Sequence, residues 1–209
     1  MTEVLFNKKL IPVAVIENAD TAIPLAQALI EAGLNVIEVT LRTDAALESI
    51  ERIKQSVPEM QIGAGTILDH KLIPQLIDLG ISFGIAPGIN TRVIETALKH
   101  NLPIMPGVVT PSDIEQARFY DLKLLKFFPA EAVGGVKVLK ALAGPYAHTG
   151  LKFIPTGGIN RDNLSSYLSL NTVAAVGGSW FVSGALLKEN KFDEITRLTK
   201  DAIAAIENI

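Results

Sequence analysis

The chain has 209 residues, a hydrophobic fraction of 48% and a formal net charge of −3, which suits one soluble domain over residues 1–209 with a sizeable core. No stretch is long and apolar enough for a membrane span, and no run of Lys or Arg points to nucleic acid as the main partner. Because the chain has no cysteine and no signal pattern at its start, we expect a cytoplasmic protein without disulfides, thiolate nucleophiles or cysteine metal sites.

Short runs rich in Val, Ile and Leu alternate with longer helical patterns, which is typical of repeated βα units and a parallel sheet. The expected strands cover residues 11–15, 35–40, 61–64, 81–85, 103–108, 123–127, 152–154 and 174–177. The expected helices cover residues 21–31, 45–56, 70–79, 91–100, 111–119, 135–142, 161–169 and 192–206, and residues 1–7 can add a short leading helix. Eight such units predict an α/β fold of the closed (β/α)₈, or TIM, barrel type.

Residues at the element boundaries agree with this division of the chain. Gly33 and Gly80 stand where helices end, and Asn90 and Asp113 stand where helices begin. The alternative fold, an open doubly wound sheet, predicts a glycine-rich turn after the first strand. Residues 16–20 occupy that position and contain no glycine, so the sequence favours the barrel.

The second strand carries an unusual carboxylate. Because side chains alternate along a strand, Val36, Glu38 and Thr40 share one face, and the apolar residues between them pack under the helices. Glu38 therefore points into the barrel, where a lone carboxylate is costly unless it is paired or hydrogen-bonded. One interpretation is catalytic; the alternative is a buried pair with Arg42 or a lysine that has no chemical role.

The sixth strand carries an unusual amine. Lys126 lies in the apolar run over residues 122–129 and shares one strand face with Leu124 and Phe128. Burial among apolar side chains disfavours a charged ammonium, and a neutral amine is a nucleophile. The alternative is a lysine at a strand end, with its ammonium in water or paired with an acid.

Active sites of such barrels form at the carboxyl ends of the strands. Thr66 follows the third strand, in the small-residue turn over residues 63–66, and adds a hydroxyl to this end. We expect Lys126 as nucleophile, Glu38 as proton shuttle, Arg42 as anchor for a carboxylate and Thr66 as supporting donor. Glu38 favours the charged form of the amine and Arg42 opposes it, and the sequence leaves this balance open.

Two glycine pairs follow the last two strands, in residues 155–160 and 177–180. Paired glycines let backbone N–H groups approach an anion closely, and the loops after strands seven and eight are the usual phosphate site of these barrels. A glycine pair alone is most often only a turn, but two pairs at these two strand ends predict a phosphate site.

The remaining polar and aromatic candidates do not point to a metal. His70, His100 and His148 all lie away from the expected catalytic end, so we expect structural or surface roles for them and no metal site. Trp180 and Phe181 follow the second glycine pair and are interpreted as packing or subunit-contact residues.

Six segments together carry a family resemblance: residues 36–43, 63–66, 86–88, 126–131, 155–159 and 177–180. In this order they resemble the bacterial aldolases of 2-keto-3-deoxy-6-phosphogluconate (KDPG) and 4-hydroxy-2-oxoglutarate (KHG). The resemblance implies a class I, Schiff-base aldolase of the Entner–Doudoroff pathway, with a (β/α)₈ fold, no metal or other cofactor, and assembly as a homotrimer. It implies cleavage of KDPG, also called 2-dehydro-3-deoxy-6-phosphogluconate, to pyruvate and glyceraldehyde 3-phosphate, with side activity on 4-hydroxy-2-oxoglutarate.

Matched by position, the resemblance makes Lys126 the Schiff-base lysine and Glu38 the general acid and base. It assigns the pyruvate carboxylate end to Thr40, Arg42, Thr66, Pro87 and Phe128, and the phosphate to Thr156, Gly157, Gly158, Gly178 and Ser179. Three alternatives stay open: an aldolase of the galactonate epimer, a phosphosugar isomerase or epimerase with Glu38 as base, and a phosphosugar-binding barrel without catalysis.

Overall fold

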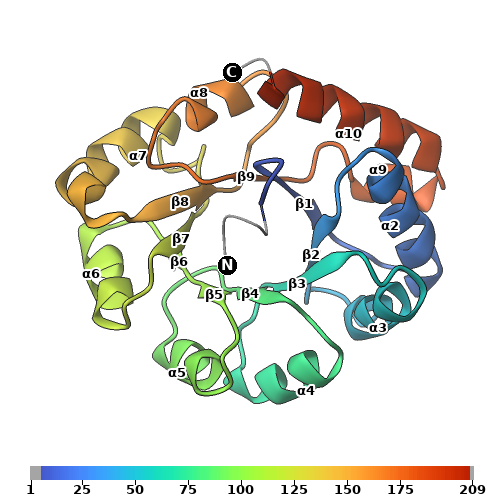
Figure 1. Ribbon diagram of the computed structural model, residues 1–209, viewed down its shortest axis with the longest axis horizontal. Helices are drawn as coiled ribbons and strands as arrows, with labels where there is room; N and C mark the ends of the chain where they lie inside the picture. The colour runs from blue at the N-terminus through green and yellow to red at the C-terminus, as the bar shows by residue number, and fades with distance from the viewer. Residues whose placement is uncertain (1–5, 208–209) are drawn as a thin grey trace.

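The structure of the protein is a computed structural model that describes residues 6–207. In this range the backbone forms strands β1 (Leu10–Ala14), β2 (Val36–Thr40), β3 (Gln61–Gly65), β4 (Phe83–Ile85), β5 (Ile104–Met105), β6 (Gly107–Val108), β7 (Leu124–Phe127), β8 (Lys152–Pro155) and β9 (Val176–Gly178). The α-helices are α2 (Ala22–Glu31), α3 (Ala46–Ser56), α4 (Ile73–Asp78), α5 (Thr91–Lys99), α6 (Pro111–Phe119), α7 (Gly135–Ala143), α8 (Leu164–Leu168), α9 (Gly184–Lys188) and α10 (Phe192–Glu207). Short 3₁₀ helices are η1 (Ala19–Thr21), η2 (His70–Leu72) and η3 (Gly144–Thr149). The strands surround a common centre and the helices lie outside them (Figure 1).

The strands of residues 6–207 form two parallel sheets. One sheet has six strands in the order β5-β4-β3-β2-β1-β9, and the other has three in the order β6-β7-β8. The α/β class and the parallel pairing agree with the sequence analysis, but the closed eight-stranded (β/α)₈ barrel expected there is wrong.

The ring of strands is interrupted at two places. Pro106 has no backbone N–H, and the single strand expected over residues 103–108 is split around it into β5 and β6, which belong to different sheets. On the other side, β8 meets the β9 segment only through isolated bridges, which join Phe153 to Val173 and Thr156 to Gly177. The hydropathy pattern of the sequence shows neither interruption.

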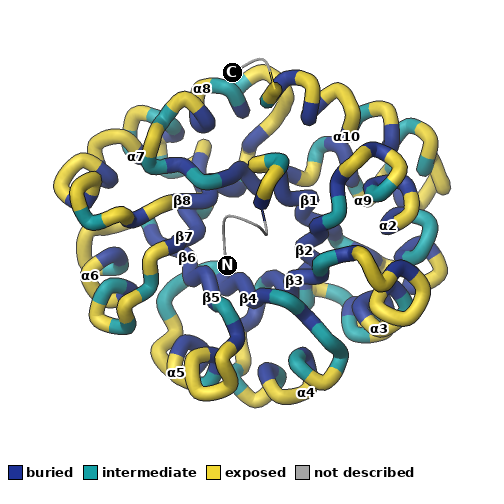
Figure 2. Tube along the Cα trace, viewed as in Figure 1, coloured by how far each residue is buried: buried dark blue, intermediate teal, exposed yellow. Residues whose placement is uncertain are grey.

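Several strands lie entirely in the interior of the molecule. Strands β1, β2 and β7 are buried along their full length, as expected for parallel strands that are covered on both faces. Figure 2 shows the buried backbone gathered at the centre and the exposed backbone on the outer helices. Because β2 and β7 carry Glu38 and Lys126, two ionisable side chains enter this interior.

Several helix boundaries follow the sequence prediction. Gly33 and Gly80 adopt left-handed backbone conformations, with φ of 84° and 82°, and Asn90 caps α5 by accepting two backbone N–H bonds. Helix α8 is shorter than the expected 161–169, and α9 was not predicted. Most of the leading helix expected over residues 1–7 lies outside the described residues. None of the helices within residues 6–207 has the length and hydropathy needed to cross a membrane.

A capping box begins α6. The Thr110 hydroxyl accepts from the Asp113 N–H at 3.2 Å, and the Asp113 carboxylate accepts from the Thr110 and Val109 N–H groups at 2.8 and 2.9 Å. Burial raises the pKa of Asp113, but the hydrogen bonds from Val109 and Thr110 outweigh it and hold the pKa below its ordinary value.

We expect Asp113→Ala to lower the free energy of unfolding by about 1 kcal/mol at neutral pH, as for other lost capping interactions. Because the folded-state pKa lies below the unfolded value, this stabilisation is present above about pH 4 and is lost as the pH falls through the folded pKa. Urea unfolding at pH 7 and pH 3 measures it, with the exposed neighbour substitution Ser112→Ala as control. An equal effect of Asp113→Ala at both pH values would contradict the prediction.

Candidate active site

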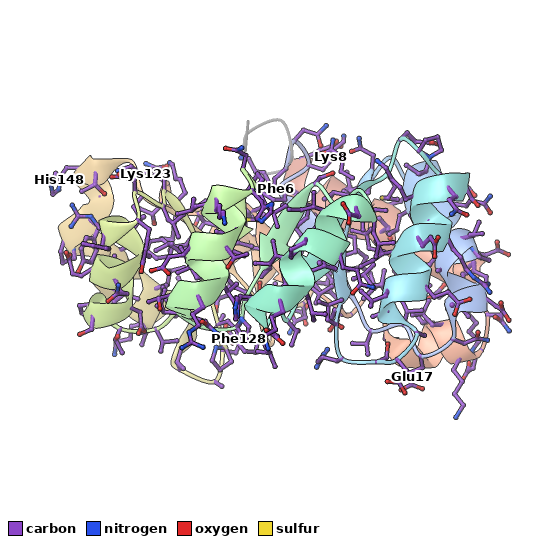
Figure 3. The ribbon with its side chains drawn as sticks, turned by 90° about the horizontal axis from the view of Figure 1, so that it is seen from below. Phe6, Lys8, Glu17, Lys123, Phe128 and His148 are labelled. Atoms are coloured by element: carbon purple, nitrogen blue, oxygen red, sulfur yellow. The ribbon has the colours of Figure 1, made fainter. Side chains whose placement is uncertain are left out.

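The carboxyl ends of the strands lie on one face of the molecule. Figure 3 places Phe128, which follows β7, and Glu17, which lies beyond β1, on the same face. Lys123 and Lys8, which precede the same two strands, lie on the opposite face (Figure 3). In parallel α/β folds, ligands bind at the carboxyl ends of the strands, so the face of Phe128 and Glu17 is where a site is expected.

Lys126 and Glu38 meet inside this end of the molecule. The Lys126 Nζ lies 3.4 Å from the Glu38 Oε1, and the two side chains are only 7% and 1% exposed. This contact confirms the inward direction that strand alternation predicts for both. It also excludes, for Lys126, an ammonium standing in water. A buried pair of this kind is found in structural and in catalytic roles, so the surroundings have to distinguish them.

The carboxylate of Glu38 occupies space that a glycine leaves open. A β-carbon on Gly65 would stand 2.1 Å from the Glu38 Oε1, which no real side chain tolerates. Gly65 ends β3, the neighbour of β2, and Gly63 pairs with Glu38 itself. The small residues of β3 therefore admit the carboxylate toward Lys126. The sequence indicated room at this strand end, but not that Glu38 fills it.

Strand β7 and its neighbours hold Lys126 in place. The Lys126 N–H donates to the Pro106 carbonyl at 2.9 Å, and the residue pairs with Gly107 of β6. A β-carbon on Gly107 would meet the Pro87 carbonyl at 2.0 Å, so the segment of Pro87 crosses close beside β6. The Phe128 ring lies 5.0 Å from the Lys126 Nζ. Phe128 thus lies beside the amine, and the Pro87 segment lies beside Gly107, the register partner of Lys126.

Arg42 lies just beyond β2. Its Nε donates to the Thr40 hydroxyl at 3.4 Å, and that hydroxyl donates to the Ala14 carbonyl at 3.1 Å. Among residues 6–207 Arg42 forms no ion pair with a carboxylate, and Glu38 pairs with Lys126 instead. The Glu38–Arg42 pair considered from the sequence is therefore not formed, and the guanidinium can receive an anion.

Thr66, which follows Gly65, has a left-handed backbone with φ of 59°. A β-branched residue in this region is a genuine outlier and costs of order 1 kcal/mol or more. Left-handed conformations of such residues cluster at functional sites. The sequence contains no signal for the left-handed backbone of Thr66. The strained residue directly follows Gly65, on which a β-carbon would stand 2.1 Å from the Glu38 Oε1.

The loop after β8 lies beside the end of β9. The isolated bridge between Thr156 and Gly177 of β9 joins them, and the Thr156 N–H donates to the Phe127 carbonyl at the end of β7. Gly157 and Gly158 have φ of 98° and 79°, a conformation that favours glycine. The structure thus brings the loop of Gly157 and Gly158 beside the second glycine pair and Ser179, which the sequence predicts to bind phosphate. Gly177 and Gly178 are the last residues of β9 and do not follow the strand as expected.

Aromatic packing explains the glycine at the end of β9. A β-carbon on Gly178 would collide with the Trp180 ring at 1.8 Å, and Trp180 packs edge-on against Phe181 at 4.7 Å between centroids. Phe181 is fully buried. The packing role expected for both residues is confirmed, and a subunit contact through Phe181 is excluded by its burial.

One of the three histidines is placed by Figure 3, while His70 begins η2, the first element after the carboxyl end of β3, and so does not lie away from the catalytic end as expected. His148 lies on the opposite face of the molecule (Figure 3). Within the described part of the chain, no group of three or more His, Cys, Asp or Glu side chains is placed to hold a metal ion.

A cavity of about 600 Å³ opens on the opposite face, lined by Phe6, Lys9, Lys123, Lys152 and neighbouring residues. Lys123 and Lys152 stand at the amino-terminal ends of β7 and β8. The buried amine, the carboxylate and the glycine loops all belong to the other ends of these strands. The carboxyl end is therefore the candidate site, and the cavity on the opposite face lies apart from it.

Comparison with known proteins gives consistent matches over nearly the whole chain. The family model described as KDPG and KHG aldolase matches residues 1–198. The KHG/KDPG aldolase of Escherichia coli K12 is 40% identical over 200 residues, covering 96% of this chain and 93% of that protein. The KDPG aldolase of Legionella pneumophila, solved with pyruvate captured at low pH as a covalent carbinolamine intermediate, is 37% identical with a TM-score of 0.92, covering 97% of this chain and 98% of that one. The KDPG aldolase of Zymomonas mobilis ZM4, solved with 3-phosphoglycerate, is 36% identical with a TM-score of 0.89, covering 98% and 97%.

Proposed function

The chain belongs to the KDPG and KHG aldolase family, and on that premise we propose that Lys126 and Glu38 carry its chemistry. It is a class I aldolase that cleaves 2-dehydro-3-deoxy-6-phosphogluconate to pyruvate and glyceraldehyde 3-phosphate and also acts on 4-hydroxy-2-oxoglutarate. The observation that carries the residue assignment is the buried contact of 3.4 Å between amine and carboxylate. A Schiff base between a lysine and a keto acid needs no metal or other cofactor.

The reaction follows from these two groups. The neutral Lys126 amine adds to the C2 ketone, and loss of water from the carbinolamine leaves an iminium. As the C3–C4 bond breaks, its electrons move into the iminium to form an enamine, and Glu38, directly or through a water, takes the proton of the C4 hydroxyl. Glyceraldehyde 3-phosphate leaves. Glu38 then returns a proton to the enamine carbon, and hydrolysis of the imine releases pyruvate and restores Lys126.

Arg42 and its neighbours provide a place for the substrate carboxylate. The guanidinium has no carboxylate partner among residues 6–207, and its contact with the Thr40 hydroxyl directs it along the end of β2. The hydroxyl of Thr66 stands at the end of the adjacent strand. The Phe128 ring lies beside the amine, and the Pro87 carbonyl lies beside Gly107, the register partner of Lys126. These positions support a pyruvate end formed by Thr40, Arg42, Thr66, Pro87 and Phe128.

The two glycine loops support a phosphate site at the other end of the substrate. Backbone N–H groups of Gly157, Gly158, Gly178 and Ser179, with the Thr156 hydroxyl, are the donors that we assign to it. Phosphate held there orients the sugar chain, so binding energy far from the reacting bond contributes to catalysis. We further propose assembly as a homotrimer, as the family resemblance implies, and a cytoplasmic location, as expected from the composition of the chain.

Gly65→Ala tests the space around Glu38. The added methyl group cannot coexist with the carboxylate in its present position, so Glu38 must move away from Lys126. A misplacement of this size is expected to reduce kcat by about 100-fold. Gly144→Ala is the matched control, because a β-carbon at Gly144 meets no atom within 4 Å. Normal turnover of Gly65→Ala would contradict the role given to Glu38.

The activity itself is tested by coupling pyruvate release to lactate dehydrogenase. Steady-state rates on KDPG, its galactonate epimer and 4-hydroxy-2-oxoglutarate decide the substrate preference, and we expect the highest kcat/KM on KDPG. If the protein binds phosphosugars but releases no pyruvate, it is a binding barrel without catalysis, and the proposal is wrong.

A further inference from the structure

Glu131 connects the end of β7 to the first glycine loop. Its N–H donates to the Gly157 carbonyl at 3.0 Å, one residue beyond the bond from the Ala130 N–H to the Thr156 carbonyl at 2.8 Å. A β-carbon on Gly158 would stand 2.6 and 2.7 Å from the Glu131 Cβ and Cγ. The backbone and the aliphatic part of Glu131 therefore define the path of the loop.

The carboxylate of Glu131 is directed to a different place from its aliphatic part. Its Oε1 accepts a short hydrogen bond from the hydroxyl of Tyr167, a fully buried residue of α8. A β-carbon on Gly135 would stand 3.0 Å from this oxygen and 3.3 Å from the Tyr167 hydroxyl, so the pair is enclosed at the start of α7. The hydrogen bond joins residues 36 positions apart in the sequence.

The direction of the Glu131 carboxylate matters because a carboxylate repels a neighbouring phosphate. With its Oε1 held by Tyr167, Glu131 presents its aliphatic part to Gly158 and this oxygen to α7 and α8. Burial, and then the Glu131 carboxylate, raise the pKa of Tyr167 above its ordinary value, so the hydroxyl keeps its proton and stays a donor. On the other side, the Asn163 side-chain amide donates to the Gly158 carbonyl at 3.0 Å.

We propose that the hydrogen bond from Tyr167 to Glu131 positions the loop of Gly157 and Gly158 for phosphate, and thereby sets the preference of the enzyme for phosphorylated over unphosphorylated keto acids. Tyr167 and Glu131 are positioning residues, since they act through the loop and not on the reacting atoms. The inference rests on the phosphate site assigned under the proposed function.

Tyr167→Phe removes the donor and keeps the ring. We expect the KM for KDPG to rise about tenfold, the usual effect of losing a hydrogen bond to a charged group. For 4-hydroxy-2-oxoglutarate, which has no phosphate, KM and kcat are expected to stay unchanged. The matched control is Tyr120→Phe, because the Tyr120 hydroxyl donates to the exposed Glu95 at 2.8 Å, between α5 and the end of α6. This control is expected to leave both substrates unaffected.

Two further variants keep the test decisive if Tyr167→Phe does not fold. Glu131→Gln retains an oxygen that can accept from Tyr167 and is expected to keep the KM for KDPG near that of the wild type. Glu131→Ala loses the acceptor and is expected to raise this KM as much as Tyr167→Phe does, with no further rise in the double variant. If the variants lose kcat/KM equally on KDPG and on 4-hydroxy-2-oxoglutarate, the hydrogen bond has a merely structural role. If their KM for KDPG does not change, the hydrogen bond has no role in phosphate recognition. Either result overturns the proposal.

Binding of inorganic phosphate separates this inference from the proposed function. Calorimetric titration of the wild type and of Tyr167→Phe with inorganic phosphate measures the phosphate affinity of each protein in the absence of turnover. Weaker phosphate binding in the variant supports the inference even if the wild type cleaves no keto acid. Equal binding in both proteins overturns it even if the wild type is a fully active aldolase.

Discussion

Lys126→Ala is expected to reduce cleavage of KDPG by at least about 10⁴-fold, since no other group replaces a covalent nucleophile. The Nζ of Lys126 is buried next to Glu38 and beneath Phe128, so no other lysine can take its position. Treatment with pyruvate and borohydride is expected to add the reduced pyruvate adduct to the peptide that contains Lys126. Peptide mass analysis of the wild type and of the variant measures it.

The matched control for this variant is Lys123→Ala. Lys123 precedes β7 and is exposed on the opposite face (Figure 3), so its loss is expected to leave turnover and trapping unchanged. Circular dichroism of Lys126→Ala establishes that the variant is folded, which is needed because the substitution leaves Glu38 buried without its partner. A wild type that forms no adduct, or a variant with near-normal turnover, would remove the Schiff-base mechanism and favour an isomerase or epimerase.

Glu38→Gln is expected to lower kcat by about 10³-fold, the typical contribution of a positioned general acid and base. The amide has nearly the same shape, so the space beside Gly65 stays filled while the proton acceptor is lost. Lys126 retains its amine, and borohydride is therefore expected still to trap pyruvate on it. The two results together distinguish loss of proton transfer from loss of the nucleophile.

The control for this second variant is Glu17→Gln. Glu17 is an exposed carboxylate on the same face of the molecule (Figure 3), so a general effect of charge at this end would appear in both variants. The rate of the cleavage step, measured before the steady state, and the steady-state kcat are compared between Glu17→Gln, Glu38→Gln and the wild type. Equal losses in Glu17→Gln and Glu38→Gln, or a Glu38→Gln variant with normal kcat, would contradict the assignment.

The direction of the two central side chains could be predicted because it depends on local geometry. Successive side chains of a strand point to opposite faces, so the apolar neighbours of Glu38 and Lys126 indicate which way each one points. The glycine turn of residues 157–158 could be located in the same way, since turns are local in sequence. The second pair, residues 177–178, was expected after its strand but ends β9. Helix ends at Gly33 and Gly80 follow from the conformational freedom of glycine.

The closed barrel could not be predicted correctly from the same patterns. Periodicity indicates a strand over residues 103–108, but pairing is decided by backbone hydrogen bonds between distant segments. A proline at position 106 lies where this strand divides between two sheets, and at β8 and β9 only isolated bridges remain. The local sequence pattern does not show whether backbone hydrogen bonds continue the sheet from β5 to β6, or from β8 to β9.

By itself the sequence determined the α/β class, the inward direction of Lys126 and Glu38, and the family to which the chain belongs. Only the tertiary structure decided that Glu38 pairs with Lys126 and not with Arg42, that Gly65 leaves the space for its carboxylate, and that Tyr167 holds Glu131 beside the first glycine loop. These contacts join segments far apart along the chain. Their geometry depends on how whole strands and helices pack, which no local pattern of residues specifies.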